Sequence, residues 1–262
     1  PNDRGFLFSD GVYEVVRCYN GHRFELERHL DRLLYGLREL RMPEISRQHL
    51  SDVSSELLRV NDLEQGEALI YLQVTRGTAK RTHYFPPTDT PQTVFASASR
   101  FRHPVGEREN GVRVILVPDT RWSRCDIKSI ALLPNVLVRQ QAVENEAAEA
   151  LFARDGFVME GSHCNFCAVV DGAVITPPAT NYILSGITRQ VVIELCKKLN
   201  ITCHERPIQL TNLNKADEIM IVGTTVEITP VIKVDEWTVG NGKPGPITRK
   251  IQQAFKEMIS RR

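Results

Sequence analysis

Residues 121–133 read Arg-Trp-Ser-Arg-Cys-Asp-Ile-Lys-Ser-Ile-Ala-Leu-Leu, a charged segment that runs directly into an apolar one. In an extended chain, Asp126 and Lys128 would project to one face and Ile127 to the other. The pattern predicts a lysine at the end of a strand, entering the core. Little water, an apolar run and the nearby charge of Arg124 would favour the neutral, nucleophilic amine that forms Schiff bases. The alternative is an ordinary lysine, one of 33 basic residues.

The composition is typical of a globular protein with a small-molecule partner. Hydrophobic residues make up 42% of the 262 residues and charged residues 25%, enough for one large domain or two modest ones. The net charge of +1 is spread along the chain, which argues against nucleic acid or an anionic membrane as partner. A small-molecule substrate is therefore expected.

The apolar runs and the cysteines indicate a cytoplasmic protein. No run approaches the roughly 20 apolar residues of a transmembrane helix, and the first residues do not resemble a signal peptide. The six cysteines lie in apolar segments and not at the spacings of a disulfide scaffold, which is typical of free thiols in a reducing compartment.

Residues 1–101 predict a small α/β domain. Asn20-Gly21 is a strong two-residue hairpin signal between β-rich segments, and Ser46 is the expected N-cap of a helix. A basic loop at 76–87 is too long for a simple turn, and long ordered loops often carry function. The expected elements are strands at 12–19 and 23–26, helices at 27–41 and 46–61, and strands at 67–75 and 92–98.

Residues 102–111 are polar, contain proline and glycine, and follow neither period, which predicts an interdomain linker. The larger domain is then expected at 112–262. Many short strands with few helices favour a barrel-like or mixed sheet, so the fold class is α/β of the α+β kind. The expected elements are strands at 112–117, 149–153, 165–170, 173–176 and 219–222, and helices at 136–147, from 184–189 to about 199, and 246–259.

Two turns of the larger domain offer backbone N–H groups to an anion. Gly186, Ile187 and Thr188 stand where a helix begins, and the free N–H groups and the dipole of such a terminus favour a phosphate. Gly223-Thr224-Thr225 follows the strand at 219–222 and adds two hydroxyl groups. Helix N-caps without a ligand are common, so each turn alone is only a candidate.

Six motifs occur along the chain in one order. They are Asp10-Gly11-Val12-Tyr13-Glu14, Glu27-Arg28-His29-Leu30-Asp31-Arg32-Leu33, Asp126-Ile127-Lys128, Glu160-Gly161-Ser162-x-x-Asn165, Leu184-x-Gly186-Ile187-Thr188-Arg189 and Gly223-Thr224-Thr225-x-Glu227-Ile228-Thr229-Pro230. Together they resemble the fold-type IV pyridoxal-phosphate aminotransferases, the group that contains the D-amino-acid and branched-chain aminotransferases. The resemblance covers nearly the whole chain and implies a small α/β domain followed by a larger one with a barrel-like mixed sheet.

The resemblance also implies pyridoxal 5′-phosphate as the cofactor. Lys128 would be the catalytic residue that holds it covalently, and Glu160 would pair with the pyridine nitrogen and keep it protonated. Arg32 would hold the phosphate as a fixed guanidinium, the alternative being a solvated helix arginine. The other cofactor-binding residues implied by the motifs are Leu184, Gly186, Ile187, Thr188, Gly223 and Thr224.

The basic loop bears on the substrate. Arg81-Thr82-His83 resembles the Arg-x-His loop that, in D-amino-acid aminotransferases, binds the substrate α-carboxylate together with a tyrosine at the position of Tyr13. Thr225 is assigned to the substrate by its motif. In the family this loop comes from the neighbouring subunit, so a homodimer with its active site near the interface is implied. The alternative is a solvated basic loop, which Lys80 favours.

The predicted activity is that of a transaminase working in two half-reactions. It would move the amino group of a D-amino acid, such as D-alanine, to a 2-oxo acid, either pyruvate or 2-oxoglutarate. A branched-chain L-amino-acid aminotransferase, an (R)-amine transaminase and aminodeoxychorismate lyase share the cofactor residues and stay open as alternatives. A non-catalytic pyridoxal-phosphate-binding protein is the alternative of another class, and the presence of both Lys128 and Glu160 argues against it.

One turn departs from the family pattern. Ser162-His163-Cys164-Asn165 stands where relatives have a serine-rich turn, so contacts made there by small hydroxyls are in doubt. A single C-x-x-C, Cys164 and Cys167, without a second pair falls short of a zinc pattern, and no metal is expected.

Overall fold

The computed structural model describes residues 2–102 and 105–260. Their contacts divide into two compact units, the first formed by residues 2–102 with Ile127–Leu132 and the second by residues 105–126 and 133–260. Strands and helices occur in both units, which confirms the predicted mixed α/β class. In the described part of the chain, no helix is long and apolar enough to cross a membrane.

The first unit is built on a four-stranded antiparallel sheet of order β2-β1-β3-β4. The predicted hairpin is confirmed, because Asn20 and Gly21 both have positive φ between the first two strands. In the third strand buried and half-buried residues alternate, so one face of the sheet meets the core. The strands are β1 (Gly11–Tyr19), β2 (His22–Arg23), β3 (Glu67–Thr75) and β4 (Thr93–Arg100).

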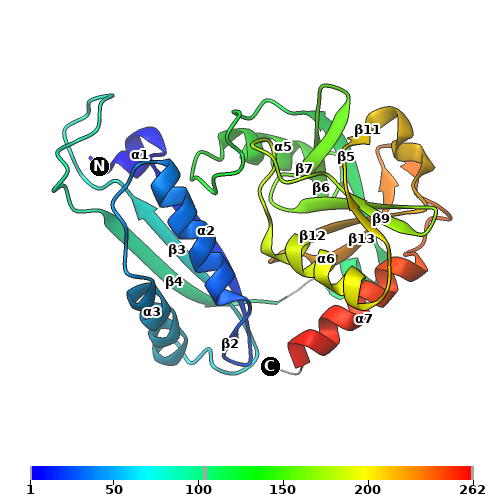
Figure 1. Ribbon diagram of the computed structural model, residues 1–262, viewed down its shortest axis with the longest axis horizontal. Coiled ribbons are helices and arrows are strands. Elements are labelled where there is room, and N and C mark those ends of the chain that lie inside the picture. Colours follow the sequence, from blue (N-terminus) through cyan, green and yellow to red (C-terminus); the bar gives the residue numbers. More distant parts are fainter. Residues whose placement is uncertain (1, 103–104, 261–262) are drawn as a thin grey trace. The chain divides into compact units, whose positions relative to one another are not determined.

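Two helices, α2 (Leu26–Glu39) and α3 (Arg47–Val60), pack on this sheet (Figure 1). A stripe of leucines on α2, Leu30, Leu33 and Leu37, is fully buried against the strands. Ser46 caps α3 as predicted, accepting a hydrogen bond from the N–H of His49. A further helix, α1 (Arg4–Phe8), was not predicted, because five residues are too few to show a helical period.

The second unit contains a ten-stranded mixed sheet of order β10-β9-β8-β12-β13-β5-β6-β7-β11, with β14 paired to β13. The pairs β10/β9, β13/β5 and β5/β6 are parallel and the others antiparallel, which confirms the mixed sheet expected from the sequence. The sheet curls into a half-barrel. Its strands are β5 (Val112–Pro118), β6 (Glu149–Arg154), β7 (Phe157–Gly161), β8 (Asn165–Val170), β9 (Ala173–Thr176), β10 (Cys203–Glu205), β11 (Ile208–Gln209), β12 (Glu218–Gly223), β13 (Glu227–Val234) and β14 (Trp237–Thr238).

Helices cover this sheet. Helix α5 packs on β5 and β6, whereas α6 and α7 lie side by side against β12 and β13 (Figure 1). Helix α5 begins three residues earlier than predicted, since Pro134 suits a first helical turn. Residues 103–104 of the expected linker at 102–111 lie outside the described residues, and the described remainder contains a short helix, α4. The bounds are α4 (Val105–Asn110), α5 (Leu133–Glu144), α6 (Ile187–Lys198), the 3₁₀ helix η1 (Leu210–Lys215) and α7 (Pro246–Ser260).

Candidate active site

The segment that carries Lys128 is anchored to β1. The N–H of Tyr13 donates to the carbonyl of Lys128 at 3.0 Å, and Val12 forms an isolated bridge with Ser129. Ile127 is buried in the core of the first unit. The predicted strand before Lys128 is wrong, because the chain turns at residues 125–126, where the Arg124 and Asp126 side chains, two residues apart, pair with each other.

The Lys128 amine lies against an aromatic ring. Its Nζ is 4.3 Å from the centroid of the Tyr13 ring, which in turn stacks on Tyr71 at 5.7 Å. Within the described part of the first unit, this Nζ has no hydrogen bond or ion pair. Tyr13 and Lys128 are thus adjacent, as residues that share one substrate would be.

Arg32 is not a solvated helix arginine. Its Nε and Nη2 donate to the two carboxylate oxygens of Glu14 at 2.7 and 2.9 Å, and His29 Nδ1 lies 2.7 Å from the same carboxylate. Burial raises the pKa of Glu14, but Arg32 and His29 outweigh it and hold the pKa far below its usual value. Burial lowers the pKa of His29 and so disfavours its charged form. Arg32 therefore supplies the positive charge that balances the Glu14 carboxylate. Glu14 therefore fixes the guanidinium plane from within the core.

The loop between β3 and β4 exposes Arg81 and His83. Both side chains flank one ring, since the Arg81 guanidinium lies 5.0 Å from the centroid of Phe8 and the His83 ring 5.6 Å from it. The sequence suggested these two loop residues, but nothing in it linked them to Phe8.

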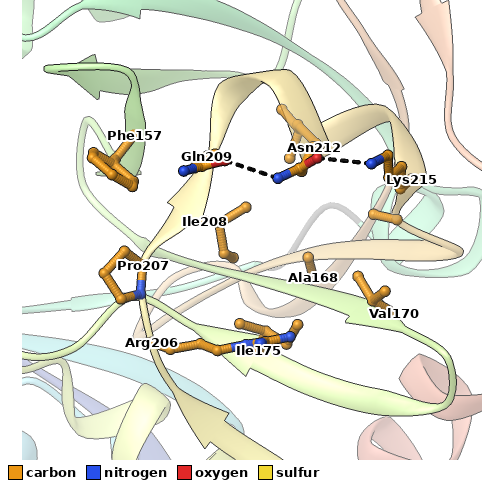
Figure 2. A pocket seen from close by; sticks show the side chains of 12 residues that line it. Phe157, Ala168, Val170, Ile175, Arg206, Pro207, Ile208, Gln209, Asn212 and Lys215 are labelled. Carbon is orange, nitrogen blue, oxygen red and sulfur yellow. Dashed lines mark hydrogen bonds between the residues drawn. The ribbon is translucent and has the colours of Figure 1, made fainter.

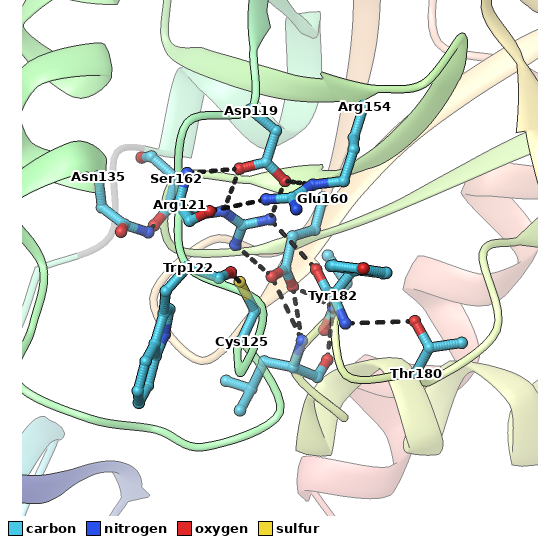
Figure 3. A network of polar contacts seen from close by, with 12 residues as sticks. Asp119, Arg121, Trp122, Cys125, Asn135, Arg154, Glu160, Ser162, Thr180 and Tyr182 are labelled. Carbon is cyan, nitrogen blue, oxygen red and sulfur yellow. Dashed lines mark hydrogen bonds and ion pairs between the residues drawn. The ribbon is translucent and has the colours of Figure 1, made fainter.

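In the second unit, Glu160 lies at the end of β7 and is 5% exposed. Its carboxylate accepts hydrogen bonds from Arg121 Nη1 at 2.6 Å, Asn165 Nδ2 at 3.0 Å and the N–H of Leu184 at 3.1 Å (Figure 3). Donors aimed at a buried carboxylate favour its ionised form. Glu160 is thus held as an anion in a fixed orientation.

Arg121, which the sequence did not single out, is the buried arginine that holds Glu160. Asp119 accepts hydrogen bonds from its Nε and Nη2, both at 3.0 Å, and Arg154 donates to the same carboxylate at 3.2 Å (Figure 3). Burial lowers the pKa of Arg121, but Asp119 and Glu160 together raise it well above its ordinary value. Arg121 is part of the stretch that suggested Lys128, but a sequence does not distinguish a buried arginine from an exposed one.

The two predicted anion turns meet at the start of β8. A Cβ on Gly186, the N-cap of α6, would overlap Asn165 Oδ1, and a Cβ on Gly223 would lie 3.2 Å from the Cβ of Cys164. Close approach therefore requires glycine at Gly186, whereas a Cβ at Gly223 would need only a small shift of Cys164. Thr188 is 4% exposed in the first turn of α6. Leu184, Ile187, Thr224 and Thr225 accompany them in the same two turns.

The turn that departs from the family forms its own cluster. Glu149 is fully buried and accepts from Ser162 Oγ at 2.6 Å, and His163 Nδ1 lies 2.7 Å from it. Cys164 is buried beside this carboxylate, at 3.4 Å. Among the described residues, no three His, Cys, Asp or Glu side chains are grouped as metal ligands.

A separate pocket of about 360 Å³ opens between β7, β8, β9 and η1 (Figure 2). Its floor is apolar, with Ala168 and Ile175 buried, and a hydrogen-bonded row of Gln209, Asn212 and Lys215 borders it. It contains none of the predicted site residues.

A family model described as amino-transferase class IV matches residues 11–234 of the chain. The chain belongs to the class IV aminotransferases. Enzymes of this family use pyridoxal 5′-phosphate, so this class IV aminotransferase is a pyridoxal-phosphate-dependent enzyme. The family, the enzyme class and the cofactor predicted from the motifs are confirmed.

Relatives and solved structures agree with this membership. The D-alanine aminotransferase of Staphylococcus haemolyticus is 41% identical over 261 residues, 99% of this chain and 92% of the relative. That of Bacillus licheniformis is 42% identical over 98% of this chain and 90% of its own. The branched-chain amino acid aminotransferase of Escherichia coli superposes with a TM-score of 0.91 at 29% identity, covering 98% of this chain and 88% of that one.

The residues of this class IV aminotransferase fit the cofactor. The first turn of α6, which follows the N-cap Gly186, supplies N–H groups suited to a phosphate. Glu160 offers an anionic acceptor suited to a protonated ring nitrogen, and Lys128 offers an amine. Arg32 and Lys128 belong to the first unit and the other cofactor candidates to the second.

Proposed function

We propose that this aminotransferase moves the amino group of a D-amino acid, such as D-alanine, to pyruvate or 2-oxoglutarate. The observation that carries this proposal is the match of nearly the whole chain to D-alanine aminotransferases at 38 to 42% identity. The exposed pair Arg81 and His83 supports it, because a guanidinium recognises a carboxylate bidentately.

We further propose the roles of the site residues. When bound, the cofactor supplies the electron sink for a carbanion at the substrate Cα. Lys128 would hold the cofactor, and its amine, once displaced by the amino donor, would take the proton from Cα as base and deliver it to the cofactor as acid. Glu160 keeps the ring nitrogen protonated from the position that Arg121 and Asn165 give it. The phosphate is bound by Arg32, Ile187, Thr188 and Thr224. Leu184, Gly186 and Gly223 also bind the cofactor, and the substrate is bound by Tyr13, Arg81, His83 and Thr225.

The proposal is tested by replacing Lys128. Lys128→Ala should abolish both transamination and the visible absorbance of the loaded enzyme, because no other residue is proposed to hold the cofactor covalently. The spectrum of the wild-type protein should change on addition of D-alanine and not of L-leucine. Retention of the band and the activity in the variant would contradict the role of Lys128.

A branched-chain L-amino-acid aminotransferase is the second candidate. Solved structures of that activity superpose with TM-scores of 0.85 to 0.91, although at only 25 to 29% identity. A panel of D-alanine, L-leucine and (R)-1-phenylethylamine as donors separates the two activities and the (R)-amine transaminase. Fastest turnover of L-leucine would replace the D-amino-acid assignment.

We also propose a homodimer in the cytoplasm. Four apolar side chains on α5, namely Leu133, Val136, Leu137 and Val143, are each more than half exposed, and clustered apolar exposure is typical of association surfaces. The substrate loop would then serve the neighbouring subunit's site. All six cysteines are free thiols, which suits a reducing compartment.

A further inference from the structure

The loop that carries Arg81 and His83 is fastened to the short helix α1. Arg4 is 3% exposed, and its Nη1 donates to the carbonyl of Thr82 at 2.8 Å and to that of Tyr84 at 3.4 Å. The backbone N–H of Arg4 also donates to the carbonyl of Gly77 at 2.9 Å. One buried arginine therefore satisfies loop carbonyls on both sides of His83.

The same arginine is held in place by Asp10. Arg4 Nε and Arg76 Nε both donate to Asp10 Oδ2 at 2.8 Å, and Arg76 continues to the carbonyl of Leu40 at the end of α2. Burial raises the pKa of Asp10, but the two arginines outweigh it and lower the pKa below its usual value. Asp10 is thus ionised at neutral pH and joins the loop to the core of the first unit.

Phe8 supplies the surface on which the two loop side chains rest. The guanidinium carbons of Arg4 and Arg81 lie 4.7 and 5.0 Å from its centroid, and the His83 ring lies 5.6 Å from it at 55°. Cation–π contact limits the rotamers of Arg81, which would otherwise be a flexible arginine on an exposed loop. A single ring therefore orients both side chains.

We propose that Arg4 and Phe8 are positioning residues that set recognition of the substrate α-carboxylate through Arg81 and His83. This inference rests on the proposed function of the loop. Bidentate binding of a carboxylate requires a fixed guanidinium plane, and small displacements of a binding group weaken it steeply. Arg4 fixes the backbone of the loop, and Phe8 fixes the side chains that leave it.

The test compares Arg4→Lys and Phe8→Leu with wild-type enzyme. Lysine keeps the charge of Arg4 but lacks a planar fork that reaches Asp10 and the loop carbonyls together. Both variants should raise the KM for D-alanine and for pyruvate about tenfold, with kcat within about twofold. The inhibition constant of propionate, a carboxylate without an amino group, should rise equally. The Kd of pyridoxal phosphate should not change.

Arg23→Lys is the matched control. Arg23 Nη1 donates to a backbone carbonyl, that of Ser51, at 2.7 Å in the same unit but away from the loop. The KM values of the Arg23→Lys variant should stay at the wild-type level. Unchanged KM and propionate inhibition in both Arg4→Lys and Phe8→Leu would overturn the inference. Equal losses of kcat and cofactor affinity would also overturn it, since they would indicate a merely structural role.

Arg81→Ala separates this inference from the proposed function. If Arg81→Ala leaves the KM for carboxylates unchanged, the proposed substrate role of the loop fails. If it raises KM while Arg4→Lys and Phe8→Leu do not, only the positioning role fails. In a double-mutant cycle, Phe8→Leu should raise the KM of Arg81→Ala by a smaller factor than it raises that of the wild-type enzyme, because part of its effect passes through Arg81. Additive effects would contradict that coupling.

Discussion

At the scale of single residues, close packing restricts the identity of the site residues as strongly as their chemistry does. Gly186 has φ −67° and ψ 137°, a conformation that any residue adopts, so its glycine is explained by space alone. Asn165 occupies that space while it holds Glu160 and the carbonyl of Leu184. Because position 186 is glycine, Asn165 can contact both the turn before α6 and Glu160.

Gly186→Ala should weaken pyridoxal-phosphate binding by roughly tenfold, about 1.4 kcal/mol, because Asn165 must leave its position. Absorbance titration of the apoenzyme measures the Kd. Gly106→Ala in α4 is the control, since its new Cβ meets nothing closer than 3.8 Å and alanine favours a helix. Equal affinities in the two variants would show that the close approach is unimportant.

Glu149 gives a pH-dependent prediction. Burial raises its pKa, and the hydrogen bonds from His163 and Ser162 overcome this and lower the pKa to about 2. The folded value lies below the ordinary value of 4.5, so its stabilisation is complete above pH 4.5 and disappears as the pH falls through 2.

Glu149→Gln should therefore lower the free energy of unfolding at pH 7 by about 3 kcal/mol and flatten its dependence on pH between 5 and 2. Urea unfolding across that range measures both effects. Glu44 is exposed, so Glu44→Gln should leave the pH dependence of the free energy of unfolding unchanged. A wild-type pH profile in the Glu149 variant would contradict the contribution of this carboxylate.

At the scale of elements, the segment after β5 holds the acid of β7. Arg121 joins Asp119 to Glu160, and Arg154 of β6 closes the network by donating to the Arg121 carbonyl at 2.8 Å. Three neighbouring strands therefore share one charge network at their ends. The orientation of Glu160 therefore depends on charged residues from neighbouring elements.

Arg121→Met should destabilise the protein by about 3–5 kcal/mol, because two buried carboxylates lose their common cation. Chemical denaturation provides the measurement. Arg59→Met removes an exposed pair with Glu56 on α3 and should hardly change the stability. Comparable losses in both variants would show that the buried network contributes no more than a surface pair.

At the scale of the whole molecule, activity is proposed to depend on association. Leu137 on α5 is 62% exposed, and Val60 on α3 is 54% exposed. Leu137→Glu should shift sedimentation toward the monomer and reduce turnover at low protein concentration, since a charge is costly in a buried interface. Val60→Glu should change neither. A monomeric wild-type protein with full activity would contradict the homodimer.

Several elements of the fold could be predicted from local patterns in the sequence. The hairpin at Asn20-Gly21, the leucine stripe of α2 and the cap at Ser46 follow from backbone conformation and helical spacing, which act within a few residues. The order of the motifs was sufficient to predict the family and the cofactor, because proteins that use the same cofactor need the same residue types to bind it. The strand predicted before Lys128 was wrong, because the chain turns at residues 125–126, where Arg124 pairs with Asp126.

Only the tertiary structure determined the partners of the charged residues. Arg32 with Glu14, Arg121 with Glu160, and Arg4 with the loop carbonyls lie 18, 39 and 78 residues apart in sequence. Which of these arginines is buried, and which carboxylate it meets, depends on strand register and helix packing. Electrostatic interactions depend on distance in space and on burial, and neither quantity is present in the order of residues.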